Sequence, residues 1–297
     1  MKTLQPNTVK WFLMIGLALI WGSSFTLMRR GLIDFSAPQV ASIRMFASFL
    51  FLFPFVIRHI SEIKKEHWKW IFATGLLGNG IPAFLFATAQ TQIPGFMAGM
   101  LNSLTPVFTL IIGYFIFKTE TTISKVMGVL LGLGGATGLI LISANGTFSH
   151  VSWYPILIVL ATVMYACSVS IIKNKLQEVK SILISGFALF IVGPPTGIYL
   201  FTTDFIPILK SNPHAMTSLG YVVILALFGT AISIVIFNRL IKVSSALFAS
   251  SVTYLIPIVA MLWGLMDGEK MVPSHLIALA AILGGVYLIN KKSTRQT

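Results

Sequence analysis

The sequence predicts an all-α polytopic membrane protein with ten transmembrane helices, arranged as two inverted five-helix repeats. Three observations support this fold class: an apolar composition, ten long apolar segments, and a similarity between the two halves. Of the 297 residues, 56% are hydrophobic and only 10% are charged, and the mean hydropathy is +0.89. A soluble domain carries about 25% charged residues. The polar surface that a protein needs to face water on all sides is therefore missing.

Ten segments are long and apolar enough to cross a bilayer, which takes about 20 mostly apolar residues in a helix. The first is too long for the apolar core of a signal peptide and lacks a small-residue cleavage site, so we expect it to be retained as a span. The single cysteine, Cys167, excludes an internal disulfide. The predicted spans are residues 10–30, 37–57, 69–90, 94–117, 123–143, 153–173, 181–201, 217–238, 245–266 and 273–290.

The basic residues orient these spans. If the amino terminus is cytoplasmic, 16 Lys and Arg residues fall in cytoplasmic segments and 4 in outer ones. Basic residues are enriched in the cytoplasmic loops of membrane proteins. We therefore expect an integral membrane protein with both termini in the cytoplasm, in a bacterial inner membrane. The net charge of +13 then reflects the basic residues on the cytoplasmic side and needs no nucleic acid to explain it. The expected partner is the lipid bilayer.

The first span changes character half-way along, in the stretch WGSSFTLMRR of residues 21–30. A large aromatic residue is followed by three small residues, two of which carry hydroxyls, and the stretch ends on two arginines. We expect Trp21 to form an apolar wall or gate and Gly22 to let a neighbouring helix or a ligand approach the backbone. Ser23 and Ser24 would place hydroxyls midway across the membrane.

The second half of the chain repeats the first. Residues 78–113, moved forward by 151 positions, align with residues 229–264 without a gap, and residues 21–30 match residues 165–174 at an offset of 144. Each half has five spans, an odd number, so the second half enters the membrane from the opposite side. Such inverted repeats are typical of transporters, whose central site opens to either side in turn. A duplication without functional meaning is the alternative. The predicted repeats are residues 10–143 and 153–290.

The motifs of this repeat resemble those of the drug/metabolite transporter superfamily, EamA type, over roughly residues 10–290. They are WGSSF in span 1, Leu104-Thr105-Pro106 in span 4 followed by Glu120, and Leu255-Ile256-Pro257 in span 9 followed by Glu269. The resemblance implies a ten-helix basket with a cavity lined mainly by spans 1, 3, 4, 6, 8 and 9. It also implies export of amino acids or other small metabolites. Arg44 fits an arginine frequent in span 2 of the family, whereas span 7 has no cationic counterpart.

Uncharged polar residues inside the spans are the candidates for a substrate pathway. An amide or hydroxyl in hydrocarbon needs a partner, so these side chains should face inward. The alternative is that they only join helices to one another, since Ser, Thr and Asn bridge spans. The candidates are Trp21, Ser24, Asn79, Asn102, Tyr165, Ser168, Thr230, Asn238, Thr253 and Tyr254.

Arg44 is the one charged residue well inside a predicted span. It lies about six residues, or roughly 9 Å, from the start of span 2. It could contact an anionic group of a substrate, such as a carboxylate or phosphate. The sequence favours a structural role instead, in which Arg44 extends toward the membrane surface or pairs with Asp34 to join spans 1 and 2.

Prolines and glycines mark two further pairs of spans. Pro106 and Pro257 occupy matching positions in spans 4 and 9, where a mid-helix proline would bend the helix and act as a hinge or as a static kink. Spans 5 and 10 carry small residues at four-residue spacing, which predicts close-packing faces. These residues are Gly128, Gly132, Gly134, Gly138, Ala280, Ala281, Gly284 and Gly285.

The remaining ionisable residues exclude several chemistries. All eight acidic residues and all five histidines fall in loops or at span ends, so we expect no proton carrier in mid-span, no metal site and no cofactor. No phosphate-binding glycine loop of an ATP-driven pump is present. The sequence thus predicts a carrier for a small amphipathic metabolite such as an amino acid. It would work down the gradient of that substrate, by exchange, or through coupling to a group that the sequence does not reveal. An intramembrane enzyme and a channel remain as alternatives.

Overall fold

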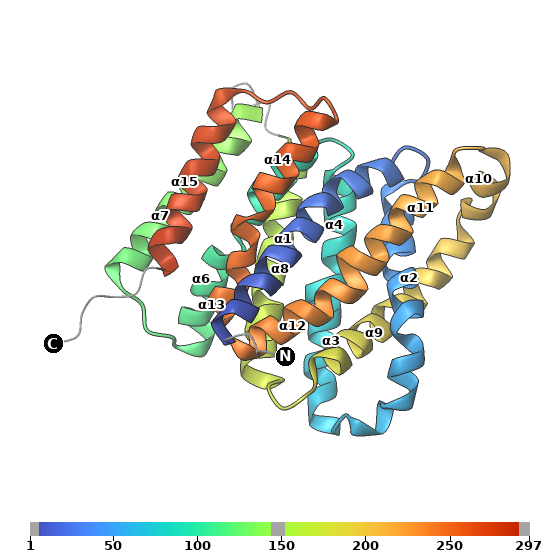
Figure 1. Ribbon diagram of the computed structural model, residues 1–297, viewed down its shortest axis with the longest axis horizontal. Helices are drawn as coiled ribbons and strands as arrows, with labels where there is room; N and C mark the ends of the chain where they lie inside the picture. The colour runs from blue at the N-terminus through green and yellow to red at the C-terminus, as the bar shows by residue number, and fades with distance from the viewer. Residues whose placement is uncertain (1–5, 144–151, 291–297) are drawn as a thin grey trace.

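The computed structural model describes residues 6–143 and 152–290, which form helices with no strand among them (Figure 1). The first half comprises α1 (Pro6–Gly31), α2 (Ala37–Arg58), α3 (Trp68–Gly75), α4 (Ile81–Ala89), α5 (Gly95–Asn102), α6 (Thr105–Phe117) and α7 (Ile123–Ser143). The second half comprises α8 (Tyr154–Lys175), α9 (Ser181–Thr202), α10 (Phe205–Ser211), α11 (Ala215–Ala226), α12 (Ser233–Val243), α13 (Ala246–Ser250), α14 (Ile256–Met266) and α15 (Pro273–Asn290).

The predicted all-α membrane fold is confirmed. In the described part of the chain, nine helical segments are long and apolar enough to cross a membrane, and a shorter apolar helix, Pro273–Ile289, is the tenth. Their bounds agree with the predicted spans to within a few residues, except that the eighth continues to Val243. Both termini, and with them Lys2, Lys291, Lys292 and Arg295, lie outside the described residues.

Two spans are interrupted by wide π-helical turns at matching places. The turn η3 (Leu76–Gly80) separates α3 from α4, and the turn η5 (Leu227–Ile232) separates α11 from α12. Leu227 lies 151 positions after Leu76, the offset of the sequence repeat. π-helical turns are rare and occur mostly at functional sites. The two halves therefore carry the same irregularity at equivalent points.

The interpretation of Pro106 and Pro257 as mid-helix prolines is wrong. Spans 4 and 9 are broken into separate helices, and each proline lies in the first turn after the break, in α6 and in α14. A proline there costs no hydrogen bond, because the first amides of a helix have no partner within it. The break in span 9 contains the 3₁₀ turn η6 (Ser251–Tyr254). The prolines begin the second half-helices rather than bend continuous ones.

Helices α7 and α15 form a pair at one edge of the bundle (Figure 1). A Cβ atom added to Gly128 would lie 2.4 Å from the Gly285 carbonyl oxygen, and one added to Gly285 would lie 2.5 Å from the Gly128 oxygen. The predicted close-packing face is thus present. Gly134 and Gly138 are not part of it, because a Cβ there would meet nothing within 4 Å. Helices α2 and α9 pair at the opposite edge.

Candidate functional site

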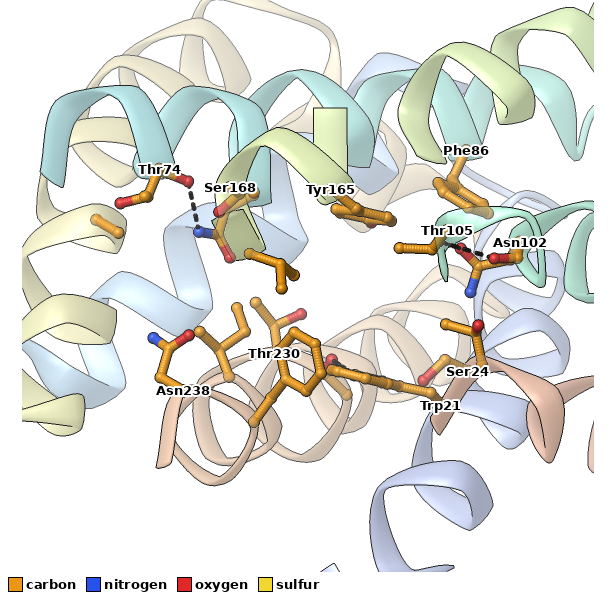
Figure 2. A pocket seen from close by; sticks show the side chains of 18 of the residues that line it. Trp21, Ser24, Thr74, Phe86, Asn102, Thr105, Tyr165, Ser168, Thr230 and Asn238 are labelled. Carbon is orange, nitrogen blue, oxygen red and sulfur yellow. Dashed lines mark hydrogen bonds between the residues drawn. The ribbon is translucent and has the colours of Figure 1, made fainter. Parts of the chain in front are cut away.

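A cavity of about 120 Å³ lies among the helices of the bundle, and Figure 2 shows side chains that line it. Its wall contains side chains from α1, η3, α4, α5, α8, η5, α12 and η6, together with residues of α2 and α9. Apolar side chains make up most of the wall. Ten residues singled out from the sequence also line it: Trp21, Ser24, Arg44, Asn79, Asn102, Tyr165, Ser168, Thr230, Asn238 and Thr253.

Trp21 joins α1 to the wide turn η5. Its indole nitrogen Nε1 donates a hydrogen bond of 3.0 Å to the carbonyl of Gly229, and its ring meets Phe237 edge-on with centroids 5.0 Å apart. The ring lies along the lower wall in Figure 2. Trp21 is therefore both a wall of the cavity and a cross-link between the two halves of the chain.

The two serines after Trp21 have different surroundings. Ser24 lines the cavity and donates to the Ile20 carbonyl of its own helix at 2.8 Å. Ser23 does not line the cavity and instead accepts a 2.8 Å hydrogen bond from Trp263 Nε1 of α14. A Cβ at Gly22 would lie 2.4 Å from Val259 Cβ, so α14 approaches α1 there. Two of the four positions thus serve the cavity, and two serve helix packing.

Two of the three asparagines in the wall come from irregular parts of the spans, and Asn238 comes from the regular helix α12. Asn79 lies in η3, where its Nδ2 donates to the Thr74 carbonyl at 3.3 Å and its buried Oδ1 has no hydrogen-bond partner. Asn102 ends α5 beside Thr105, whose hydroxyl donates to the Asn102 carbonyl at 2.8 Å. Asn238 ties α12 to α9 through a 2.9 Å bond to Ser185. Breaks in regular helix therefore place two of these amides at the cavity wall.

Helix α8 contributes the opposite wall. Tyr165 stacks on Phe86 with ring centroids 5.9 Å apart, and Ser168 lies against Gly78, where an added Cβ would be 2.4 Å from the serine hydroxyl. Thr253 lines the cavity from η6, whereas Tyr254 does not line it and packs against the hydrophobic core. Sequence reasoning did not single out Phe86 or Gly78 as lining residues, although both lie in the repeated segment 78–113.

The pairing of Arg44 with Asp34, one form of the structural role favoured by the sequence, is wrong. Asp34 accepts hydrogen bonds from Asn212 Nδ2 at 2.6 Å and from Ser218 Oγ at 2.5 Å. Arg44 lines the cavity, and its Nε donates a 2.7 Å hydrogen bond to the hydroxyl of Thr230 in η5. The cation therefore faces the centre of the bundle rather than the membrane surface.

At one end of the bundle, ion pairs join the two halves of the chain. Arg29 binds Glu269 at 2.5 Å, and Arg30 binds Asp267 at 2.6 Å. The Glu269 carboxylate, only 4% exposed, also accepts hydrogen bonds from the backbone amides of Gly95 at 2.9 Å and Phe96 at 3.3 Å. A carboxylate is favourable at the amino end of a helix, here α5. Glu269 thus holds spans 1, 4 and 9 together.

The opposite end is held by lysines. Lys173 of α8 donates to the carbonyls of Ile241, Lys242 and Ser244 at the end of α12. Lys242 in turn donates to the carbonyls of Gln177 and Val179 just after α8. Each helix thus contributes a cation to the end of the other.

The same end carries a surface ion pair. Lys180 Nζ lies 2.9 Å from Glu62, which links the loop before α9 to the loop after α2. The hydrogen bond from Lys180 lowers the pKa of the Glu62 carboxyl below its ordinary value. Within the described residues, no group of three or more His, Cys, Asp and Glu side chains is placed to hold a metal ion.

A bundle of membrane-spanning helices around a central, mainly apolar cavity with several polar side chains in its wall defines an integral membrane protein that can hold a small solute within the bilayer. The chain belongs to the EamA-like transporter family, whose model matches residues 9–141 and 152–291. It is therefore a membrane transporter rather than an enzyme.

Similar proteins carry the same description. The chain is 25% identical to an uncharacterized transporter of Archaeoglobus fulgidus, over 95% of this chain and 99% of that protein. It is also 25% identical to the uncharacterized inner membrane transporter YedA of Escherichia coli, over 93% and 89%, and to the uncharacterized transporter YvbV of Bacillus subtilis, over 98% and 94%. A solved structure titled "Crystal structure of protein" shares the fold, with a TM-score of 0.67 and 15% identity over 95% of this chain and 96% of that one.

Proposed function

We propose that the protein is a carrier that exports small amphipathic metabolites, amino acids among them, by alternating access between its two halves. The observation that carries the proposal is the central cavity, whose wall takes η3 from one half and η5 from the other. Equivalent elements of opposite direction can exchange roles, which is how inverted repeats open a central site to either side. Aromatic and amide side chains in the wall suit a substrate with both apolar and polar parts.

The distribution of basic residues indicates which end of the bundle faces the cytoplasm. The end with Lys173, Lys180 and Lys242 also carries acidic residues, but its loops contain more Lys and Arg than the loops at the other end. Because of the positive-inside bias, we propose that this end of the bundle faces the cytoplasm and that both termini are cytoplasmic. The relative YedA is described as an inner membrane transporter, and we propose the same membrane for this chain.

No acidic residue lines the cavity, and the eight in the chain lie in loops or at the ends of spans. A carrier that moves its substrate against a gradient with protons commonly keeps a carboxylate or an imidazole in the pathway. We therefore propose facilitated transport or exchange. Purified protein in lipid vesicles should not accumulate substrate when only a pH gradient is imposed, and uphill accumulation under that condition would contradict this coupling.

Counterflow tests the carrier itself. Metabolites whose export differs between cells with and without the protein supply the candidate substrates. Vesicles containing the protein and preloaded with such a substrate should take up the labelled compound faster than empty vesicles, and the rate should saturate. An uptake rate that rises linearly with substrate concentration and is the same with and without preloaded substrate indicates a channel. Chemical conversion of the compound indicates an intramembrane enzyme. Vesicles with denatured protein provide the control for leakage.

A further inference from the structure

Arg44 carries a charge that is paired with no acidic side chain in the described part of the chain. Its guanidinium has five N–H donors, and only Nε is used, in the bond to Thr230. No side-chain acceptor is bonded to the two terminal nitrogens among the described residues. The eight acidic residues all lie outside the cavity wall, and the nearest acid along the chain, Asp34, is bound by Asn212 and Ser218.

This arrangement is costly for a protein unless a ligand completes it. A buried charge without a counter-charge is strongly unfavourable, and the protein offers a neutral hydroxyl where a structural pair would have a carboxylate. Arg44 is half-buried and lines the cavity, so the missing partner can reach it there. The ligand that compensates the charge is an anion.

The residues of the wall favour an anion with one negative charge over an anion with two. Among the described residues, Arg44 is the only Lys or Arg in the wall, so the wall can balance one negative charge of a ligand but not two. A guanidinium binds a carboxylate through two parallel hydrogen bonds. A phosphate monoester, with nearly two charges near neutral pH, would keep one of them unpaired. The rings of Trp21, Phe86 and Tyr165 provide apolar surface for the rest of the molecule.

A second polar group points to a ligand independently. The Oδ1 atom of Asn79 is buried and accepts no hydrogen bond, although buried polar atoms are nearly always paired. Asn79 is 8% exposed and lines the same cavity. A donor carried by a bound molecule, such as an ammonium or amide N–H, would satisfy it.

We infer that the transported molecule is a small carboxylate and that the terminal nitrogens of Arg44 bind its carboxylate group. The inference rests on the proposed transport function and adds the chemical class of the substrate. It also assigns Arg44 a role in binding in place of a role in packing.

Matched ligand pairs test the inference on the purified full-length protein in detergent. The probes are L-leucine and L-leucinamide, phenylacetate and phenylacetamide, hexanoate and hexanamide, and phenyl phosphate. We expect at least one carboxylate to raise the melting temperature in a saturable way and its amide to bind at least tenfold more weakly. Equal stabilisation by the amides, stronger stabilisation by phenyl phosphate, or no effect of any carboxylate overturns the assignment.

Variants of Arg44 provide a second readout. Without ligand, Arg44→Gln should melt at the same temperature as the unmodified protein or higher, because it removes an unpaired charge. It should also lose the response to carboxylates. Arg44→Lys keeps the charge but not the paired hydrogen bonds, so binding should weaken about tenfold. Arg239→Gln, which neutralises an exposed arginine, is the matched control and should bind normally. A carboxylate response that survives in Arg44→Gln overturns the inference.

Failure of this inference can be told from failure of the transport function. Saturable counterflow of an uncharged or cationic compound that persists in Arg44→Gln would leave the carrier intact and exclude the carboxylate assignment. Absence of saturable counterflow for every exported metabolite would contradict the carrier itself.

Discussion

At the scale of single residues, the cavity depends on side chains that both line it and hold its walls together. Trp21 is the clearest case, since its indole N–H bonds to Gly229 across the two halves while its ring borders the cavity. Trp263 makes a similar bond, to Ser23, but lies outside the cavity. Substitutions of the two tryptophans can therefore distinguish an effect on helix packing from an effect on transport.

Replacing each tryptophan by phenylalanine should give different results in transport and similar results in stability. Trp21→Phe and Trp263→Phe each remove one hydrogen bond, worth about 1 kcal/mol of unfolding free energy. Thermal melting should therefore show comparable small losses. Counterflow should slow markedly only in Trp21→Phe. Equal slowing in both variants would show that stability alone limits transport.

The sequence predicted most of the polar residues in the cavity wall, because polar residues are rare in these spans and hydrocarbon favours an inward orientation for them. It could not place Arg44, since the partner of Arg44, Thr230, belongs to a π-helical turn that no residue pattern revealed. Ser23 and Ser24 are adjacent in sequence but point about 100° apart on a helix, so only one reaches the cavity. Tyr254 and the two prolines lie at or directly after the breaks in spans 4 and 9, which the residue pattern did not predict.

At the scale of helices, the bundle combines a contact-rich frame with an irregular interior. The α7–α15 pair meets at Gly128 and Gly285 with backbone against backbone. The central spans are interrupted by η3, η5 and η6. In a bilayer, where apolar side chains gain little by leaving lipid, such close backbone contact is what holds helices together.

A large side chain on the frame should therefore separate α7 from α15. Gly128→Leu would place atoms where the Gly285 carbonyl lies, and we expect a loss of about 1–3 kcal/mol in stability, as for overpacked cores. Gly134→Leu is the matched control, because a Cβ there meets nothing within 4 Å. Thermal melting in one detergent measures both. A larger loss for Gly134→Leu would refute the assigned packing face.

At the scale of the whole molecule, the two ends of the bundle are held by different interactions. The residues involved nevertheless occupy equivalent positions in the sequence repeat. Lys173 lies 144 positions after Arg29, the offset that matches span 6 to span 1. Arg29 binds Glu269, which follows span 9, and Glu120 is the residue that follows span 4 in the same way. Lys173 is instead bonded to the carbonyls at the end of α12, and the Glu120 side chain is exposed.

Alternating access then predicts an exchange of partners. When the Arg29–Glu269 pair opens, Lys173 should approach Glu120. In a Cys167→Ala background, cysteines at positions 29 and 269 should cross-link in the present state, and cysteines at 120 and 173 in the other. A substrate gradient should shift the yield from one pair to the other. Cross-linking of both pairs in a single fixed ratio under all conditions would contradict the exchange.

The wide turn η5 also fixes which side chains of the following helix look inward. A π-helical turn holds one residue more than an α-helical turn, and each residue of an α-helix rotates the next by about 100°. Deleting a single residue from Leu227–Ile232 would therefore restore regular winding and swing Asn238 away from Ser185 by roughly that angle. The single extra residue in η5 therefore determines which side chains of α12 face the cavity.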